Sequence, residues 1–161
     1  MDRLWSPWRA KYIATGVDSQ ASSCVFCRLG RETENDEANF VLHRGINAFV
    51  ALNLYPYIAG HLLVLPYEHL GDLDSTPKEI TDELMDLTKQ SQTALRKVYS
   101  PPGFNIGMNL GAAAGAGIVD HIHLHILPRW SGDTNFMTSI AETRVIPEDL
   151  KTTYNKLCGQ F

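Results

Sequence analysis

Three of the six histidines alternate with aliphatic residues in segment 121–127, which reads HIHLHIL. In a strand, successive side chains point to opposite faces, so His121, His123 and His125 would share one face and the aliphatic residues the other. Solvent exposure alone does not favour histidine at three alternate positions, and neighbours on one strand rarely all reach a single metal ion. The row therefore indicates a reactive site in which the three imidazoles have different tasks.

The loop before this segment contains only glycine and alanine from residue 111 to residue 117. Side chains this small let backbone N–H groups approach an anion closely. Alone, such a loop would be interpreted as a flexible tight turn, but directly before a row of histidines it indicates a phosphate cradle. Imidazole beside phosphate predicts phosphoryl or nucleotidyl transfer with a histidine nucleophile.

The chain has three cysteines, Cys24, Cys27 and Cys158, and an odd number argues against a disulfide framework. Cys24 and Cys27 form a C-x-x-C pair. Taken alone, this spacing leaves three interpretations open: a metal-ligand pair, a redox pair or a chance arrangement. The flanking residues do not favour the strand and helix of a thioredoxin-like redox site.

The surrounding pattern predicts the elements that position these residues. Two apolar runs, 48–52 and 62–65, are separated by turn residues and predict a wide hairpin. Residues 76–79 predict a capping box, with Thr76 as N-cap, Pro77 as first helical residue and Glu79 at the third position. A long amphipathic helix follows and stops at Pro101. Two further strands, 104–109 and 121–127, and a short helix within 147–157 complete an α+β arrangement of a helix packed on an antiparallel sheet.

Composition sets the outer limits on function. The chain has 161 residues and a formal net charge of −4, which predicts one domain and argues against a basic nucleic-acid-binding surface. The longest stretch without Asp, Glu, Lys or Arg, residues 45–67, is too interrupted by proline, glycine and polar residues to span a membrane. The N-terminus shows no signal-peptide core, so a cytoplasmic location is expected.

The segment 121–127 resembles the signature of the histidine triad (HIT) superfamily of nucleotide hydrolases and transferases. Two further segments, 53–66 (NLYPYIAGHLLVLP) and 108–111 (MNLG), resemble the hairpin and the strand into the phosphate loop of that family. Segments 4–9 (LWSPWR), 53–57 and 127–136 (LPRWSGDTNF) resemble a bacterial branch that includes diadenosine tetraphosphate phosphorylases. The similarity extends over about residues 4–150.

The resemblance implies a HIT-like α+β fold, with an antiparallel sheet of about five strands, one long helix and short flanking helices. It implies a single domain over 1–161, made of an N-terminal extension with the C-x-x-C pair (1–39), a core (40–130) and a C-terminal tail (131–161). It also implies a homodimer; the absence of a nucleic-acid or membrane partner is expected from the charge and composition given above.

The resemblance assigns the catalytic roles to His123, as the nucleophile, and His125, as a phosphate contact. His43 and His61 match no catalytic position, and we expect His43 at the surface and His61 in the hairpin. The nucleotide-binding residues that the resemblance implies are Leu52, Asn53, Leu54, Asn109, Gly115, Ala116 and Gly117. Alanine at residues 112–114 and 116 replaces the hydroxyl and amide side chains that many relatives carry there, which leaves phosphate binding to the backbone.

Some members of the family hold a structural zinc ion, which here implies the ligands Cys24, Cys27, His69 and His121. A set of two cysteines and two histidines has the composition of a closed tetrahedral zinc site.

The implied function is cleavage of dinucleoside polyphosphates through a nucleotidyl-histidine intermediate, with an adenine nucleotide or dinucleotide as substrate. Phosphate as the acceptor would make the protein a phosphorylase, and water would make it a hydrolase. An alternative is a nucleoside phosphoramidase or a HIT hydrolase that releases a mononucleotide. A second alternative is a nucleotide-binding adaptor without catalytic activity.

Overall fold

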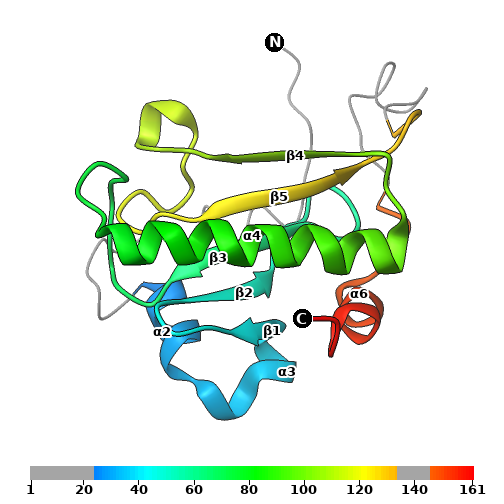
Figure 1. The fold of residues 1–161 in the computed structure, drawn as a ribbon, viewed down its shortest axis with the longest axis horizontal. Helices are drawn as coiled ribbons and strands as arrows, with labels where there is room; N and C mark the ends of the chain where they lie inside the picture. The colour runs from blue at the N-terminus through cyan, green and yellow to red at the C-terminus, as the bar shows by residue number, and fades with distance from the viewer. Residues whose placement is uncertain (1–23, 134–145) are drawn as a thin grey trace.

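The computed structural model describes residues 24–133 and 146–161. The tryptophan-containing segment 4–9 and the end of segment 127–136 therefore lie outside the described residues. Figure 1 shows the arrangement of the helices and strands. In chain order they are α2 (Val25–Arg31), η1 (Thr33–Asn35), α3 (Asp36–Asn39), β1 (Val41–Arg44), β2 (Ala48–Leu52), β3 (Leu62–Pro66), α4 (Lys78–Tyr99), β4 (Gly103–Met108), η2 (Ala112–Ala114), β5 (Leu124–Arg129) and α6 (Leu150–Leu157).

The strands form one antiparallel five-stranded sheet in the order β1-β2-β3-β5-β4, which confirms the expected α+β class and strand number. Strand β5 lies between β3 and β4, and His125 is paired with Leu63 on one side and with Gly107 on the other. The histidine segment therefore lies inside the sheet, where neighbouring strands fix its register.

The predicted strand 121–127 is wrong at its N-terminal boundary, because β5 begins only at Leu124 and extends to Arg129. Just before it, the N–H of Ile122 donates to the carbonyl oxygen of Leu70 at 2.6 Å. The residues around His121 thus lie beside the chain that follows β3, outside the sheet proper. This displacement separates His121 from the other two histidines of the row.

Helix α4 covers one face of the sheet and crosses in front of the strands in Figure 1. The aliphatic residues that alternate with the histidines lie under this helix, as the alternation predicted. The core formed there includes Ile80, Leu84, Leu87 and Leu95 of α4 together with Ile122, Leu124 and Ile126. Full burial of one such side chain contributes about 1.5 to 3 kcal/mol, so this layer holds the histidine segment firmly in place.

The predicted capping box at the start of α4 is wrong by one position. The N-cap is Pro77, at φ −53° and ψ 143°, and no side chain caps the helix. The hydroxyl of Thr76 donates instead to the carbonyl oxygen of Asp72 at 2.6 Å, which closes the preceding turn. The helix consequently begins at Lys78.

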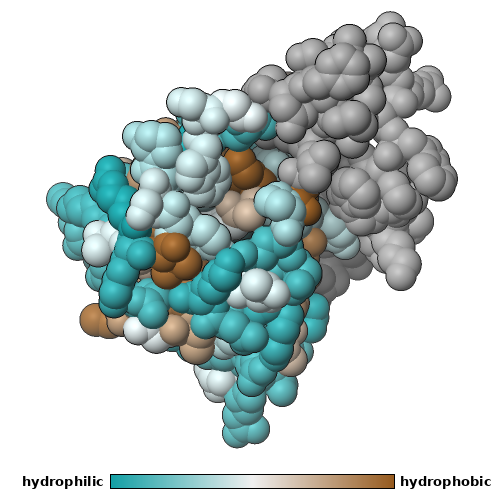
Figure 2. Space-filling view, turned by 90° about the vertical axis from the view of Figure 1, so that its right-hand side faces the viewer, coloured by the Kyte–Doolittle hydropathy of each residue, from teal (hydrophilic) through white to brown (hydrophobic). Residues whose placement is uncertain are grey.

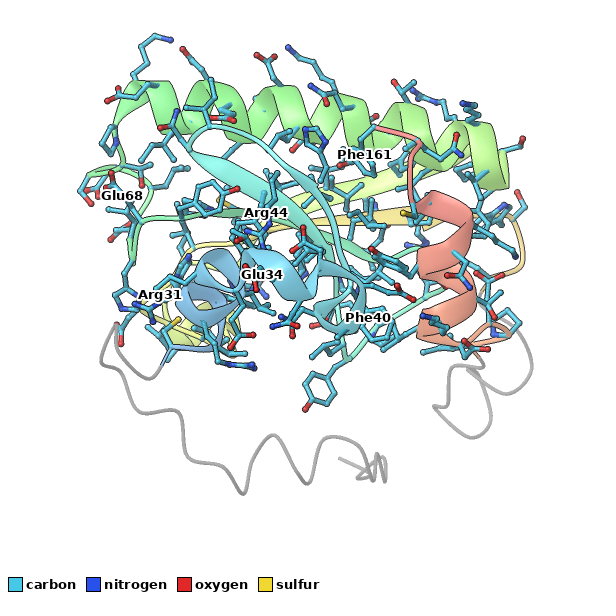
Figure 3. All side chains as sticks on the ribbon, turned by 90° about the horizontal axis from the view of Figure 1, so that it is seen from below. Arg31, Glu34, Phe40, Arg44, Glu68 and Phe161 are labelled. Carbon is cyan, nitrogen blue, oxygen red and sulfur yellow. The ribbon has the colours of Figure 1, made fainter. Side chains whose placement is uncertain are left out.

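A second layer covers the opposite face of the sheet, as Figure 3 shows with α4 on one side and α2 and α3 on the other. Phe26 and Leu29 of α2 pack with Phe49, Leu63 and Leu65 of the central strands. Every residue of β2 and β3 is therefore buried. This burial on both faces explains why these strands appear in the sequence as continuous apolar runs.

Arg44 of β1, labelled in Figure 3, anchors the end of α2. Its guanidinium donates to the carbonyl oxygens of Leu29 and Gly30 at 3.0 and 2.9 Å. It also forms a bidentate ion pair with Asp36, in which Nε and Nη2 lie 3.0 and 2.7 Å from Oδ1. A helix C-terminus leaves carbonyl groups without hydrogen-bond partners, and this arginine supplies the donors for two of those in α2. It thereby also holds α2 against the sheet.

Helix α6 confirms the short C-terminal helix that the sequence predicted. The side chain of Asp149 caps it by accepting the N–H of Thr152 at 2.8 Å. Tyr154 and Leu157 are buried in the same core as α4.

The surface of the molecule is mainly hydrophilic at the end that lies on the right in Figure 1. Figure 2 views this end and shows only small, separate apolar areas among the coloured residues. Among the described helices, none combines the length and apolar character needed to cross a bilayer.

The turn between β1 and β2 is held to α4 by one carboxylate. Glu83 accepts the backbone N–H groups of Ile46 and Asn47 at 2.6 and 2.7 Å. A Cβ at Gly45 would lie 2.1 Å from Oε1 of Glu83, so only glycine fits beside this contact without displacing it. The position of the β1–β2 edge relative to the helix thus depends on Glu83.

We expect Glu83→Ala to lower the free energy of unfolding by about 1 to 2 kcal/mol, because two backbone donors lose a charged acceptor. Urea unfolding followed by circular dichroism would measure the change. Gln90→Ala, an exposed position on the same helix, is the control and should change the free energy by less than about 0.5 kcal/mol. Equal effects of the two substitutions would contradict this role of Glu83.

Candidate functional site

His123 is held by a hydrogen bond to its own backbone segment. Its Nδ1 lies 3.0 Å from the carbonyl oxygen of His121. A carbonyl can only accept, so Nδ1 carries the proton and Nε2 keeps its lone pair. Burial lowers the pKa of His123 below its usual value of 6.5, which favours the neutral ring. The bond and the burial together produce the form of imidazole that a nucleophile requires.

A chain of hydrogen bonds that begins at the backbone N–H of Tyr57 determines which ring nitrogen of His125 carries the proton. The N–H of Tyr57 donates to Nδ1 of His61 at 3.1 Å, so the proton of neutral His61 is on Nε2. That Nε2 lies 2.9 Å from Nδ1 of His125 and donates to it. The remaining proton of His125 is therefore on its Nε2, which is buried and has no partner among the described residues. A buried donor of this kind is suited to an oxygen of a bound phosphate.

Both rings of this pair are neutral at physiological pH. Burial, and then the neighbouring His125, lower the pKa of His61 to about 3. Burial, and then His123, lower the pKa of His125 to about 4. Since neither ring is charged, the direction of each hydrogen bond in the chain remains fixed across the neutral range.

We expected His61 only as a hairpin residue without a catalytic role, but the structure places it in contact with His125. His61 is only 1% exposed, and the ring of Tyr57 lies over both His61 and His125, with centroids 4.8 and 6.0 Å away. Leu63 of β3 pairs with His125, and His61 lies two residues before Leu63, directly ahead of the strand. Only the pairing of β3 with β5 reveals this neighbour, and a single sequence does not contain it.

His43, expected at the surface, is half-buried, and its ring stacks on that of Phe161 with the centroids 5.5 Å apart.

His121 belongs to a different group of side chains, defined here as the Cys2His2 cluster (Cys24, Cys27, His69 and His121). The Nε2 of His121 donates to the carbonyl oxygen of Pro66 at 3.0 Å, so Nδ1 keeps its lone pair. That Nδ1 lies 3.5 and 3.4 Å from the sulfurs of Cys24 and Cys27. His121 is fully buried, and its Nδ1 faces the two sulfurs of the cluster.

The geometry of the Cys2His2 cluster fits a tetrahedral metal ion. The four ligand atoms all lie within 4.8 Å of one another, and Nδ1 of His69 is 3.3 Å from the sulfur of Cys27. Zinc bonded to sulfur and nitrogen at its usual distances requires separations of about 3.3 to 3.8 Å between ligand atoms. Burial, and then Cys24, raise the pKa of the Cys27 thiol to about 11, so a bound cation would have to replace its proton. The residues present can hold such an ion.

In the glycine- and alanine-rich loop, some of the backbone N–H groups donate to carbonyl oxygens of the same loop. Gly111 and Gly115 have φ of +79° and +88°, values that favour glycine. The N–H of Gly115 donates to Ala112 and the N–H of Ala116 to Gly111, at 3.0 and 3.3 Å. No such bond is found for the N–H of Gly117 within the described part of the chain.

The remaining nucleotide-binding candidates lie at the ends of β2 and β4. Leu52 ends β2 and is buried, whereas Leu54 is 43% exposed. The side-chain oxygen of Asn53 accepts the N–H of Tyr55 at 2.9 Å, and its nitrogen lies 3.3 Å from Nδ1 of His61. Asn109 directly follows β4, where the ladder has reached Leu124, so the continued register places it opposite His123.

Comparison with known proteins agrees with this arrangement. The model of the HIT domain family matches residues 32–132, which is more than half of the chain. The chain is 36% identical over 165 residues to an AP-4-A phosphorylase of Mycobacterium tuberculosis, with 100% of this chain and 85% of the relative covered. It is 42% identical over 87 residues to the asymmetrical bis(5'-nucleosyl)-tetraphosphatase of Schizosaccharomyces pombe, with 53% of this chain and 46% of that protein covered.

Among solved structures, a zinc-bound histidine triad family protein from Mycobacterium smegmatis superimposes with a TM-score of 0.70 at 31% identity. The alignment covers 88% of this chain and 94% of that one. The matching family model, the full-length similarity and the shared fold lead to one assignment. This chain is a member of the HIT domain family.

Proposed function

We propose that this protein cleaves dinucleoside polyphosphates by transferring a nucleotidyl group first to His123 and then to an acceptor. The observation that carries the proposal is the opposite proton arrangement of two adjacent rings. His123 presents the lone pair of Nε2, while His125 presents the proton of Nε2, and their ring centroids are 4.9 Å apart. The similarity to enzymes named for diadenosine tetraphosphate and dinucleoside tetraphosphates supports this class of substrate.

In the first step, Nε2 of His123 forms a bond to the α-phosphorus while the bond from that phosphorus to the bridging oxygen breaks. The leaving group departs as a polyphosphate anion that needs no proton. The N–H of His125 stabilises the charge that develops on the phosphoryl oxygens. The ring of His123 becomes positive as it bonds to phosphorus, and the carbonyl of His121 stabilises its Nδ1–H.

In the second step, the acceptor attacks the same phosphorus and His123 leaves as neutral imidazole. With diadenosine tetraphosphate, the first step releases ATP and leaves an adenylyl group on His123. Phosphate as the acceptor then gives ADP, and water gives AMP. The name of the mycobacterial relative favours phosphate as the acceptor.

The nucleotide is proposed to bind between the ends of β2 and β4. Leu54 would flank the base, and Asn53, already beside His61, would bind the ribose hydroxyls, whereas the side chain of Leu52 is buried in the core under α4 and is not assigned a base contact. Asn109 would contact the phosphate opposite His123. In the loop of Gly115, Ala116 and Gly117, we assign phosphate binding chiefly to the N–H of Gly117, because the other two are bonded within the loop.

The protein is further proposed to bind one structural zinc ion and to form a homodimer. The Cys2His2 cluster supports zinc by its distances and burial, and a zinc-bound relative of the same fold supports it independently. Strand β4 supports the dimer, because it is the last strand of the sheet and its Ile106 is 42% exposed. An unpaired edge with an apolar side chain is a surface that a second copy can extend.

The reaction predicts products that depend on the acceptor. Diadenosine tetraphosphate incubated with the protein should yield ADP and ATP only when inorganic phosphate is present, as resolved by anion-exchange chromatography. AMP formed without phosphate would show water as the acceptor and support the mononucleotide-releasing alternative.

His123→Ala provides the control, because it removes the attacking nitrogen and leaves the nucleotide pocket in place. It should lower turnover by at least 1,000-fold, on the order of the loss of a catalytic nucleophile, while nucleotide binding remains measurable by calorimetry. Wild-type protein that binds nucleotide and is no more active than this variant would identify an adaptor.

His61→Phe should lower kcat by about tenfold, equivalent to about 1.4 kcal/mol, because His125 loses the donor that fixes its proton on Nε2. His61→Gln keeps an N–H donor and should retain more activity than His61→Phe. Steady-state kinetics on proteins of matched thermal stability would measure the difference. His43→Phe, which lies on β1 away from this pair, should remain as active as the wild type; full activity in His61→Phe would exclude the role.

Metal analysis by mass spectrometry should find about one zinc ion per chain in protein purified without chelators. Cys27→Ser should lose most of this zinc and lower the melting temperature, because a buried ligand is removed. Cys158→Ser changes the exposed third cysteine and should leave both the zinc content and the melting temperature unchanged. Retention of the full zinc content in Cys27→Ser would show that the ion binds elsewhere.

A further inference from the structure

Phe26 connects the Cys2His2 cluster to the nucleophile. It lies between Cys24 and Cys27 on α2, and it is buried. Its ring centroid is 5.5 Å from that of His121, at an interplanar angle of 77°, and 5.0 Å from that of His123, at 55°. The short helix that supplies both thiols therefore also places an aromatic ring against the reacting histidine.

The hydrogen bonding of His123 alone does not fix the orientation of its ring. The bond from Nδ1 to the carbonyl of His121 defines one point on the ring, and the ring can still tilt about that point. Two neighbouring rings restrict this freedom: Phe26, tilted by 55° with its centroid 5.0 Å away, and His125, nearly edge-on at 69° with its centroid 4.9 Å away. Attack on phosphorus requires the lone pair of Nε2 to be aligned with the bond that forms, so the tilt affects the rate directly.

The position of Phe26 is itself determined at both ends of α2. At the C-terminal end, Arg44 binds the carbonyl oxygens of Leu29 and Gly30. At the N-terminal end, Cys24 is the N-cap, and both cysteines lie in the Cys2His2 cluster. A metal ion in the cluster would hold the two cysteines and His121 together. It would thereby fix both structures that touch His123: the ring of Phe26 and the carbonyl of His121.

We propose that Phe26 is a positioning residue for His123, and that through it the metal-bound cluster holds the nucleophile in the orientation for attack. This inference rests on the proposed function for the identity of the nucleophile. It gives the cluster a part in the chemistry beyond stabilising the fold.

Phe26→Leu tests the proposal, because leucine keeps an apolar side chain and removes the flat ring beside His123. We expect kcat to fall by about tenfold, with KM and zinc content unchanged. Phe26→Tyr, which restores the ring, should recover most of the lost activity. Val25→Ala alters the other residue between the two cysteines and should have no effect on kcat. If activity in Phe26→Leu falls only in proportion to its zinc content, Phe26 merely builds the metal site and the proposal is wrong.

A second measurement does not depend on turnover. Nitrogen NMR of the histidine rings, without substrate, should give for wild-type His123 a single narrow signal of the Nδ1–H form. In Phe26→Leu, and in wild-type protein from which zinc has been removed by a chelator, this signal should broaden or split. The signals of His61 and His125 should be unchanged. An identical His123 signal in all three samples would overturn the proposal. Wild-type protein that forms no nucleotidyl-His123 would refute the proposed function and leave this readout intact.

Discussion

The Nδ1–H of His123 donates to the carbonyl oxygen of His121, two residues earlier in the chain. This bond depends on the path of the backbone from His121 to His123, and that path is held by the layers on either side of the sheet. Helix α4 holds the aliphatic residues on one face, while α2 packs against the other. The free lone pair on Nε2 of His123 is therefore a consequence of how the sheet is packed.

A backbone group also begins the second chain of bonds, which passes from Tyr57 through His61 to His125. Each ring in it is neutral because burial makes a charge unfavourable. The two chains end on adjacent rings with opposite proton arrangements. One nitrogen can attack and the other can donate, and no residue needs to change its protonation before substrate binds.

The features that could be predicted from the sequence are those with a local periodicity. The alternation around His123 and the stripe of Leu84, Leu87 and Leu95 gave the sheet, the long helix and the faces that meet. The start of α4 was misplaced because the hydroxyl of Thr76 bonds backward to Asp72. The role of His61 depends on the pairing of β3 with β5. Strand β1 is only four residues long, so it showed no clear pattern in the sequence. The local alternation therefore indicated the row that contains the proposed nucleophile, while its neighbour His61 could be found only from the register of the sheet.

Because the donor at residue 57 is a backbone N–H, the proton arrangement of the site does not depend on the chemical identity of that side chain. Any residue other than proline supplies the same group at the same place. The carbonyl at residue 121 is also a backbone group, but its position depends on the side chain of His121, which belongs to the Cys2His2 cluster. A substitution at residue 57 that preserves the path of the main chain can therefore alter the shape of the pocket without changing which nitrogen presents its lone pair.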